Sequence, residues 1–210
     1  MKKFRWQLLF IFLTGIVVGI LLLVEQPENT PNNTTEPVQG GYYTEALVGS
    51  LQRLNPLFDT HNQVDRDVDR LIYSRLMTFD ERGNAVHDLV ASSGVSADGT
   101  VYNFELKPNV VWHDGAPLTA ADVVFTVELM RNGGDFVPAD LQEFWTDIEV
   151  IGLSDTSLQF RLPEPFAPFL DYLSFGILPQ HLLNGKTVAE INELDFNIQP
   201  ALLWRRFAVC

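Results

Sequence analysis

Residues 98–125 read DGTVYNFELKPNVVWHDGAPLTAADVVF, and this stretch decides the fold class. Its first part alternates in polarity over 101–106, which predicts a strand with one buried face. That face carries three large apolar side chains, Tyr102, Phe104 and Leu106. The dipeptide Asp98-Gly99 just before it predicts the turn of a hairpin.

The second part of the stretch predicts a helix. Thr119 and Asp122 have the spacing of a capping box, in which the Asn, Ser or Thr side chain and the acid three residues later close the helix start. The helix is expected to continue to about Arg131 and to end at Gly133-Gly134. Its inward face is expected to carry Val123, Val124, Val127 and Met130.

Strands and helices continue on both sides of this stretch. Residues 157–162 alternate in the same way as 101–106, after a Ser154-Asp155 turn, and predict a second strand. Upstream, Tyr42–Val48 reads as a short β-like run. The mixture of both element types indicates an α/β or α+β fold, and no internal repeat is visible.

A further helix is predicted from about Val64 to Met77. Its apolar face would consist of Val68, Leu71, Ile72 and Leu76. Three acids crowd the first turns of this helix, Asp65, Asp67 and Asp69. We interpret them as a helix start, where the helix dipole favours negative charge, in preference to a metal site.

The composition excludes several classes of protein. The chain of 210 residues carries 14 Lys and Arg against 27 Asp and Glu, a net charge of −13. Removing Lys2, Lys3 and Arg5 leaves 11 cations against the same 27 acids, so the chain from Glu25 onward carries −16. This charge argues against nucleic acid as a partner. The single cysteine, Cys210, allows no intrachain disulfide and no Cys-rich metal site.

The first 24 residues are interpreted as a membrane anchor or a signal sequence. A run without charge extends from Leu8 to Val24, and at 1.5 Å per residue its 17 positions span about 25 Å. Residues 4–24 together would reach across the membrane, with the cations on the cytoplasmic side and the remainder of the chain exported. A cleaved signal peptide has the same layout, so both alternatives stay open.

Residues 25–40, EQPENTPNNTTEPVQG, hold three prolines and only one aliphatic residue. This composition predicts a disordered linker. The pattern becomes globular from Gly41, and the folded domain is expected to cover 41–200.

Motifs for catalysis are missing from the sequence. There is no Gly-x-Ser-x-Gly elbow, no phosphate-binding loop and no dinucleotide fingerprint. The pairs His87-Asp88 and His113-Asp114 are interpreted as solvated or capping residues, because neighbours in sequence seldom face each other. We therefore expect no enzyme, no cofactor and no metal site.

Several motifs occur in an order that resembles the family 5 extracellular solute-binding proteins, the peptide- and nickel-binding components of ABC importers. The motifs are DRLIYSRLMTFD at 69–80, GNAVHDLVA at 83–91, DGTVYNFELK at 98–107, VWHDGAPLTAADVVF at 111–125, LPEP at 162–165 with Phe169, and ILPQHL at 177–182. The likeness covers about residues 42–200.

The resemblance implies the N-terminal lobe of a type II periplasmic-binding-protein fold, an α/β fold in which two lobes enclose a peptide or similar small solute. It places Thr60, His61 and Asn62 at the cleft, and a second candidate region contains Phe136, Phe144 and Trp145. The implied partners are ABC permease subunits with a cytoplasmic ATPase, and the domain would lie on the extracytoplasmic side of the cell membrane. An exported, membrane-tethered sensor or interaction module without a transport role stays open as the alternative.

Two features depart from the family pattern. Family members are more than twice this length, so we expect the lobe to be truncated. After Pro200 the family continues with a Gly-Thr-Gly-Pro-Tyr-like turn, whereas residues 201–210 read ALLWRRFAVC. We interpret these ten residues as an atypical tail, such as a frameshift would produce.

Overall fold

The computed structural model describes residues 12–20 and 44–198. Residues 12–20 are helical and belong to one compact unit, and residues 44–198 belong to another. Among these described residues, no helix combines the length and the apolar character needed to cross a membrane. The predicted linker 25–40, the tail 201–210 and most of the predicted anchor lie outside the described residues.

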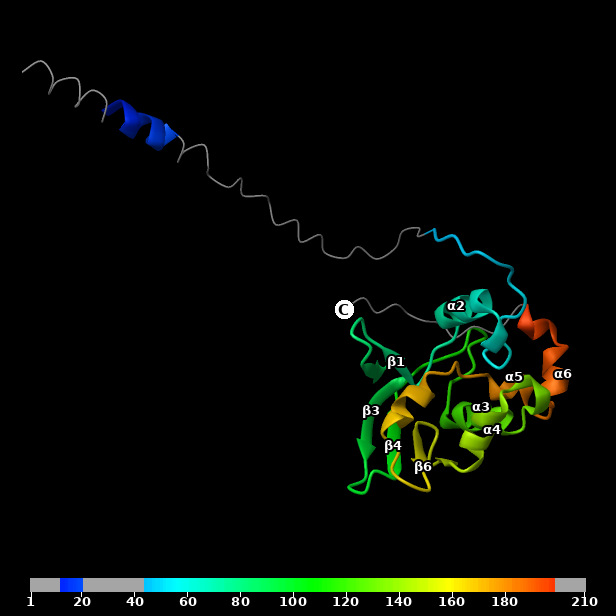
Figure 1. Ribbon diagram of the computed structural model, residues 1–210. Coiled ribbons are helices and arrows are strands. Elements are labelled where there is room, and N and C mark those ends of the chain that lie inside the picture. The colour runs from blue at the N-terminus through cyan, green and yellow to red at the C-terminus, as the bar shows by residue number, and fades with distance from the viewer. Residues whose placement is uncertain (1–11, 21–43, 199–210) are drawn as a thin grey trace, which may run out of the picture. The chain divides into compact units, whose positions relative to one another are not determined.

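A four-stranded antiparallel sheet organises the second unit (Figure 1). It contains β3 (Val90–Val95), β4 (Val101–Leu106), β5 (Glu149–Gly152) and β6 (Ser157–Arg161), in the order β3-β4-β6-β5. The two strands predicted by alternation are confirmed as β4 and β6, and they pair with Phe104 opposite Leu158. Gly99 adopts a φ of +73° in the turn between β3 and β4, a conformation that favours glycine.

A separate hairpin joins β1 (Met77–Phe79) to β2 (Ala85–His87). Asp80 organises its turn, because its Oδ1 accepts hydrogen bonds from the backbone N–H groups of Arg82 and Asn84, over 2.9 and 2.8 Å. Such Asx contacts replace the regular strand ladder where the chain reverses.

The helix predicted from the capping box is confirmed as α3 (Ala120–Arg131). Asp122 accepts a hydrogen bond from the Thr119 N–H over 2.8 Å, which closes the first turn. Val123, Val127 and Met130 are buried as predicted, whereas Val124 is half-buried. Gly133 follows the helix, and a Cβ there would lie 2.2 Å from Cγ2 of the buried Val137, so the close approach requires glycine.

The remaining elements are short and connect the sheet to its surroundings. They are η1 (Asp59–His61), α2 (Gln63–Ile72), η2 (Gly134–Phe136), α4 (Ala139–Thr146), η3 (Ala167–Leu173), α5 (Gln180–Leu183), α6 (Val188–Asn192) and η4 (Asp195–Asn197). The core lies between the sheet, α3, α4 and η3. Its largest fully buried side chains include Trp112, Trp145, Tyr73, Phe160 and Phe169.

Two upstream predictions are wrong. Residues 44–48 form no strand. Helix α2 ends at Ile72 instead of continuing to Met77, because Tyr73 is extended and Arg75 forms a β-bridge with Gly176.

The predicted apolar face of this helix is confirmed only in part, since Leu76 is buried and Ile72 packs against the core, but Leu71 does not face inward. Leu71 is 69% exposed, whereas the buried side chains of this helix are Asp65 and Asp69. The position of α2 therefore brings two carboxyl groups, together with the side chain of Ile72, against the remainder of the domain.

Candidate functional site

Two neighbouring cavities open where the chain around η1 meets the segment 134–142. The larger cavity has a volume of about 710 Å³, and the smaller one about 450 Å³. The larger is lined by Pro56, Asp59, Thr60, Arg66, Asp69, Arg70, Arg75, Thr78, Phe79, Met130, Leu141, Asp171, Tyr172, Ser174, Phe175 and Gly176. The smaller is lined by His61, Gly134, Asp135, Phe136, Val137, Pro138, Ala139 and Gln142.

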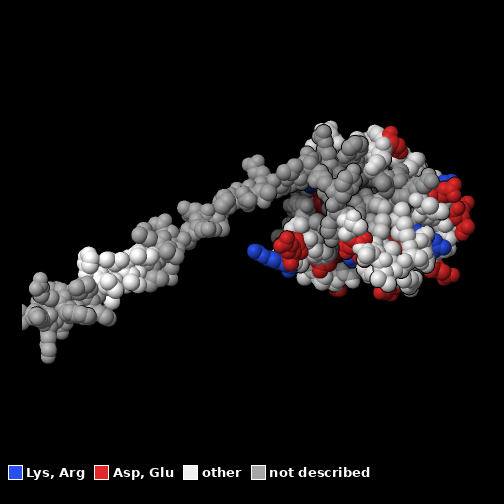
Figure 2. Space-filling view, turned by 90° about the horizontal axis from the view of Figure 1, so that it is seen from above, with Lys and Arg blue, Asp and Glu red and all other residues white. Residues whose placement is uncertain are grey.

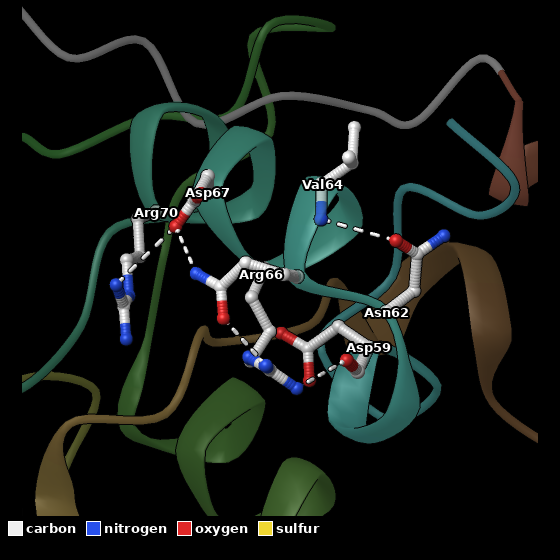
Figure 3. Close-up of polar contacts among 7 residues, drawn as sticks. Asp59, Asn62, Val64, Arg66, Asp67 and Arg70 are labelled. Carbon is white, nitrogen blue, oxygen red and sulfur yellow. Dashed lines mark hydrogen bonds and ion pairs between the residues drawn. The ribbon is translucent and has the colours of Figure 1, made fainter. Parts of the chain in front are cut away.

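The start of α2 fixes the position of η1 (Figure 3). Asn62 caps the helix, since its Oδ1 accepts a hydrogen bond from the Val64 N–H over 3.0 Å, and its Nδ2 donates one to the Ser50 carbonyl over 3.0 Å. Arg66 points back from the helix and donates hydrogen bonds to the carbonyls of Asp59 and Thr60. These contacts hold Asp59 and Thr60 at the edge of the larger cavity.

The buried acids of α2 differ in their partners. Asp65 accepts hydrogen bonds from the backbone N–H groups of Gln52 and Arg53, over 2.8 and 3.1 Å, and so ties the preceding segment to the helix. Neither carboxyl oxygen of Asp69 has a hydrogen-bond partner of regular geometry, although Asp69 is only 1% exposed, and the nearby backbone N–H of Asn55 lowers its pKa only slightly against burial.

Burial changes the ionisation of the acids beside the larger cavity. It raises the pKa of Asp69 to about 8, with a further increase from the negative charges of Asp59 and Asp65. It also raises the pKa of Asp59 to about 6, against the lowering effect of Arg66, Arg75 and Arg70. Asp69 is therefore mostly protonated at neutral pH when the cavity is empty.

Aromatic side chains form the walls on the side of α4. Phe58 and Phe136 meet edge to face with their ring centroids 5.7 Å apart. Phe144 stacks on Tyr172 at 4.0 Å, and Tyr172 lines the larger cavity. Trp145 is fully buried beside Phe144 and makes its other ring contacts in the core.

The structure brings four of the six predicted site residues to these cavities or their walls. Thr60 lines the larger cavity, His61 and Phe136 line the smaller one, and Phe144 supports Tyr172. Asn62 serves as a helix cap, and Trp145 lies in the core. Contact of these residues with a ligand stays a prediction.

Asp59 and Asp69 line the larger cavity and were not among the predicted site residues. The signal that could have found Asp69 is the i, i+4 spacing of Asp65 and Asp69, which puts both carboxyl groups on one helix face.

Three members of the two adjacent His-Asp pairs contact residues outside their own pair. Asp114 instead pairs with His181, with 2.6 Å between its Oδ2 and the ring Nε2, and this contact lowers the pKa of Asp114. Asp88 accepts a hydrogen bond from the Arg75 N–H over 3.0 Å, and His87 bonds Ser93 over 2.9 Å. In the part of the chain that the structure describes, no group of three or more His, Cys, Asp or Glu side chains could hold a metal ion.

The fold matches solved structures from two bacteria. One is NikZ from Campylobacter jejuni in complex with Ni(L-His), with a TM-score of 0.59 and 33% identity, over 72% of this chain and 29% of NikZ. Another is the oligopeptide-binding protein AppA from Bacillus subtilis in complex with a nonapeptide, with a TM-score of 0.64 and 27% identity, over 72% of this chain and 30% of AppA.

The sequence comparisons agree with this class of fold. Residues 84–193 match the family described as bacterial extracellular solute-binding proteins, family 5 middle. The curated sequence of Bacillus subtilis AppA is 30% identical over 165 residues, which cover 77% of this chain and 30% of AppA. The chain therefore belongs to the family 5 extracellular solute-binding proteins, and it spans about a third of the length of this relative.

Proposed function

We propose that this chain contributes the first lobe of the substrate-binding subunit of an ABC importer, which captures peptides or similar small solutes outside the cytoplasm. The observation that carries the proposal is the family membership of residues 84–193, together with curated relatives named as peptide-binding proteins of ABC transporters. The proposed partners are permease subunits, with a cytoplasmic ATPase as the source of energy.

The lobe would provide one rigid wall of a solute cleft. The sheet and α3 form a packed platform, and the cavities lie around the connections η1 and η2, with further lining from α2, β1 and α4. Binding sites on loops that a rigid scaffold positions are common in such proteins. A second lobe of the complete protein would close over the solute by a hinge movement, and no covalent step is required.

Four of the predicted site residues fit a ligand-contacting role on this wall, Thr60, His61, Phe136 and Phe144, whereas Asn62 supports them as the cap of α2. Phe136 is 37% exposed beside the smaller cavity, so a solute can reach its ring. Trp145 has a supporting role in this proposal, since it packs beneath Phe144 and is fully buried.

We also propose that residues 4–24 attach the domain to the membrane, with the domain on the extracytoplasmic side. This rests on the uncharged run from Leu8 to Val24 behind three cations. The acidic surface that Figure 2 shows, on which red side chains outnumber blue ones, fits an exported domain without nucleic acid as a partner.

Chemical-shift mapping tests the proposed wall. The isotope-labelled 210-residue chain in detergent micelles is titrated with pentaalanine, and shifts are expected at His61 and Phe136. The variant Phe136→Ala should weaken binding by about fivefold or more, because it removes an exposed aromatic contact. Leu153→Ala is the matched control, since Leu153 is 57% exposed and lies outside both cavities. Shifts that avoid residues 58–62 and 134–145 would contradict the proposal.

A further inference from the structure

A buried acid without a regular hydrogen-bond partner lines the larger cavity. Asp69 is 1% exposed, and neither of its carboxyl oxygens has a hydrogen-bond partner of regular geometry. Its neighbour on the same helix face, Asp65, satisfies both oxygens with backbone N–H groups. Because buried polar atoms in folded proteins are nearly always paired, an unpaired carboxyl group at a cavity indicates a partner that binds there.

The charged groups around Asp69 come from several elements. Asp59 on η1 and Asp65 on α2 both raise the pKa of Asp69, and the pKa of the nearby Tyr73 hydroxyl group is raised by burial and, to a smaller extent, by Asp69. The positive neighbour is Arg75, whose charge lowers the pKa of Asp69 without cancelling the effect of burial.

The other two cavity arginines bond elsewhere. Arg66 donates to the carbonyls of η1 and to Gln63 Oε1, and Arg70 pairs with Asp67 at 3.5 Å on the outer face of α2. Figure 3 shows the contact of Arg66 with Asp59 and that of Arg70 with Asp67. Neither group forms a hydrogen bond with Asp69, whose two carboxyl oxygens are buried and keep unsatisfied acceptor capacity.

The remaining lining of the larger cavity adds aromatic rings and a third aspartate. Phe79, Tyr172 and Phe175 contribute the rings, and Asp171 on η3 contributes the carboxyl group. Aromatic faces attract ammonium and guanidinium groups, and the attraction increases where water is excluded. A volume of about 710 Å³ accommodates an arginine- or lysine-sized side chain with part of a peptide backbone.

We propose that the larger cavity is a subsite for a positively charged group of the solute, an amine or a guanidinium, which the carboxylates of Asp69 and Asp59 bind. This deepens the proposed function and rests on it, because it assigns a class of solute, cationic peptides, to the same wall. Thr60, the neighbour of Asp59, links the subsite to the predicted cleft residues.

Binding at this subsite would be coupled to the release of a proton. With the pKa of Asp69 at about 8, the empty subsite holds a proton at pH 7. An incoming cation keeps its own charge, the carboxyl O–H bond breaks, and the proton passes to solvent, so charge balances. An opposite charge at close range lowers the pKa of a carboxyl group by about 1–3 units.

The direct test is an NMR titration of the Asp69 side-chain carboxyl carbon in the full 210-residue chain. Without ligand, its midpoint is expected near pH 8, and 50 mM methylguanidinium chloride should lower the midpoint by about one unit or more. Sodium chloride at the same concentration controls for ionic strength. A midpoint that methylguanidinium does not move relative to sodium chloride overturns the proposal.

Variants distinguish binding of methylguanidinium at this subsite from a general attraction of cations by the acidic domain. Asp69→Asn and Asp59→Asn should each weaken methylguanidinium binding by about tenfold, as expected for the loss of a charged partner. Glu164→Gln is the matched control, because Glu164 is an exposed acid that lines neither cavity, and it should leave binding unchanged. If Asp69→Asn fails to fold, Asp59→Asn and the titration of the wild-type chain still decide the question.

A pair of pentapeptides distinguishes this inference from the proposed function. One peptide carries lysine at its centre and the other carries norleucine, which has the same chain without the amine. Tighter binding of the lysine peptide by about fivefold or more is expected. Equal binding of both peptides overturns the cation subsite and leaves peptide capture intact, whereas binding of neither overturns both proposals.

Discussion

Asn55 and Asn197 lie 142 positions apart, and the side-chain amide of Asn55 donates a hydrogen bond of 2.9 Å to Oδ1 of Asn197. Both residues are buried. The backbone adds a second link, since the Leu54 N–H donates to the Asn197 carbonyl over 2.7 Å. These two hydrogen bonds connect the first residues of the described domain to its last ones. Asn55 precedes Pro56, which lines the larger cavity. The position of η1 in the candidate site therefore depends on residues far away in the sequence.

Asn197→Ala is expected to destabilise the domain by about 2–4 kcal/mol, because it leaves several buried polar groups without a hydrogen-bond partner. Besides Asn55, the Asn197 side chain bonds the carbonyls of Ile191 and Asn192, over 2.9 and 2.8 Å. Urea unfolding followed by tryptophan fluorescence measures the change. Asn103→Ala is the control, since Asn103 is exposed on β4 and its loss should cost no more than about 0.5 kcal/mol. Equal destabilisation by both variants would contradict the stabilising role of the Asn55–Asn197 contact.

Asp122 joins two motifs of the family, and its replacement tests that link. Its Oδ2 accepts from the Thr119 N–H at the start of α3, and its Oδ1 accepts from the Gln180 N–H at the start of α5, each over 2.8 Å. Asp122→Ala should destabilise the domain by about 2–4 kcal/mol, and Asp122→Asn by less, because the amide keeps one acceptor oxygen. Thermal unfolding compares the two with Asp140→Ala, an exposed acid in the first turn of α4. A loss for Asp140→Ala as large as that for Asp122→Ala would disprove the link.

The elements that the sequence predicted well are those with local signals. β4, β6 and α3 follow from alternation and from the capping box, which depend on neighbouring residues alone. The order of the family motifs predicted the class of fold for the same reason, since these motifs mark turns and element starts. Asp122 is an example, because its capping role needs only Thr119, three residues away.

The buried face of α2 could not be predicted in this way. Asp65 is buried because it accepts hydrogen bonds from Gln52 and Arg53, which lie 13 and 12 residues earlier in an irregular segment. The hydrophobic pattern of the helix favoured Leu71 instead, and tertiary contacts override such a pattern. The cavities depend even more on distant segments, since Thr60, Leu141 and Tyr172 meet around one space.

The stability of the domain should depend on pH through Asp69. Its pKa of about 8 in the folded chain lies above the ordinary value of 3.8, so the folded chain holds the extra proton between these values. Stability is therefore expected to fall as the pH rises from 4 to 8 and to level off above 8. Asp69→Asn should match the wild-type chain near pH 4 and exceed its stability by about 1–3 kcal/mol at pH 8.5, after allowance for solvent screening.

Urea unfolding at pH 4.5, 6.5 and 8.5 measures this dependence. Asp67→Asn is the control, because its carboxyl group lies on the outer face of α2 and should not alter the slope. Parallel pH profiles for the wild-type chain and Asp69→Asn would show that the carboxyl group of Asp69 ionises normally in the folded domain.

Gly176 forms a close contact beneath the larger cavity, and a single methyl group there should be costly. A Cβ at this position would lie 2.6 Å from Cγ of Pro56 and 2.8 Å from Cβ of Tyr73, distances at which the neighbours must move. Gly176→Ala is expected to destabilise the domain by about 1–3 kcal/mol and to displace Pro56 at the cavity edge. Gly94→Ala on β3 is the matched control, since nothing lies within 4 Å of its added Cβ. Thermal unfolding compares the stability of the two variants. If Gly176→Ala is as stable as Gly94→Ala, the close approach of Gly176 to Pro56 and Tyr73 does not require glycine.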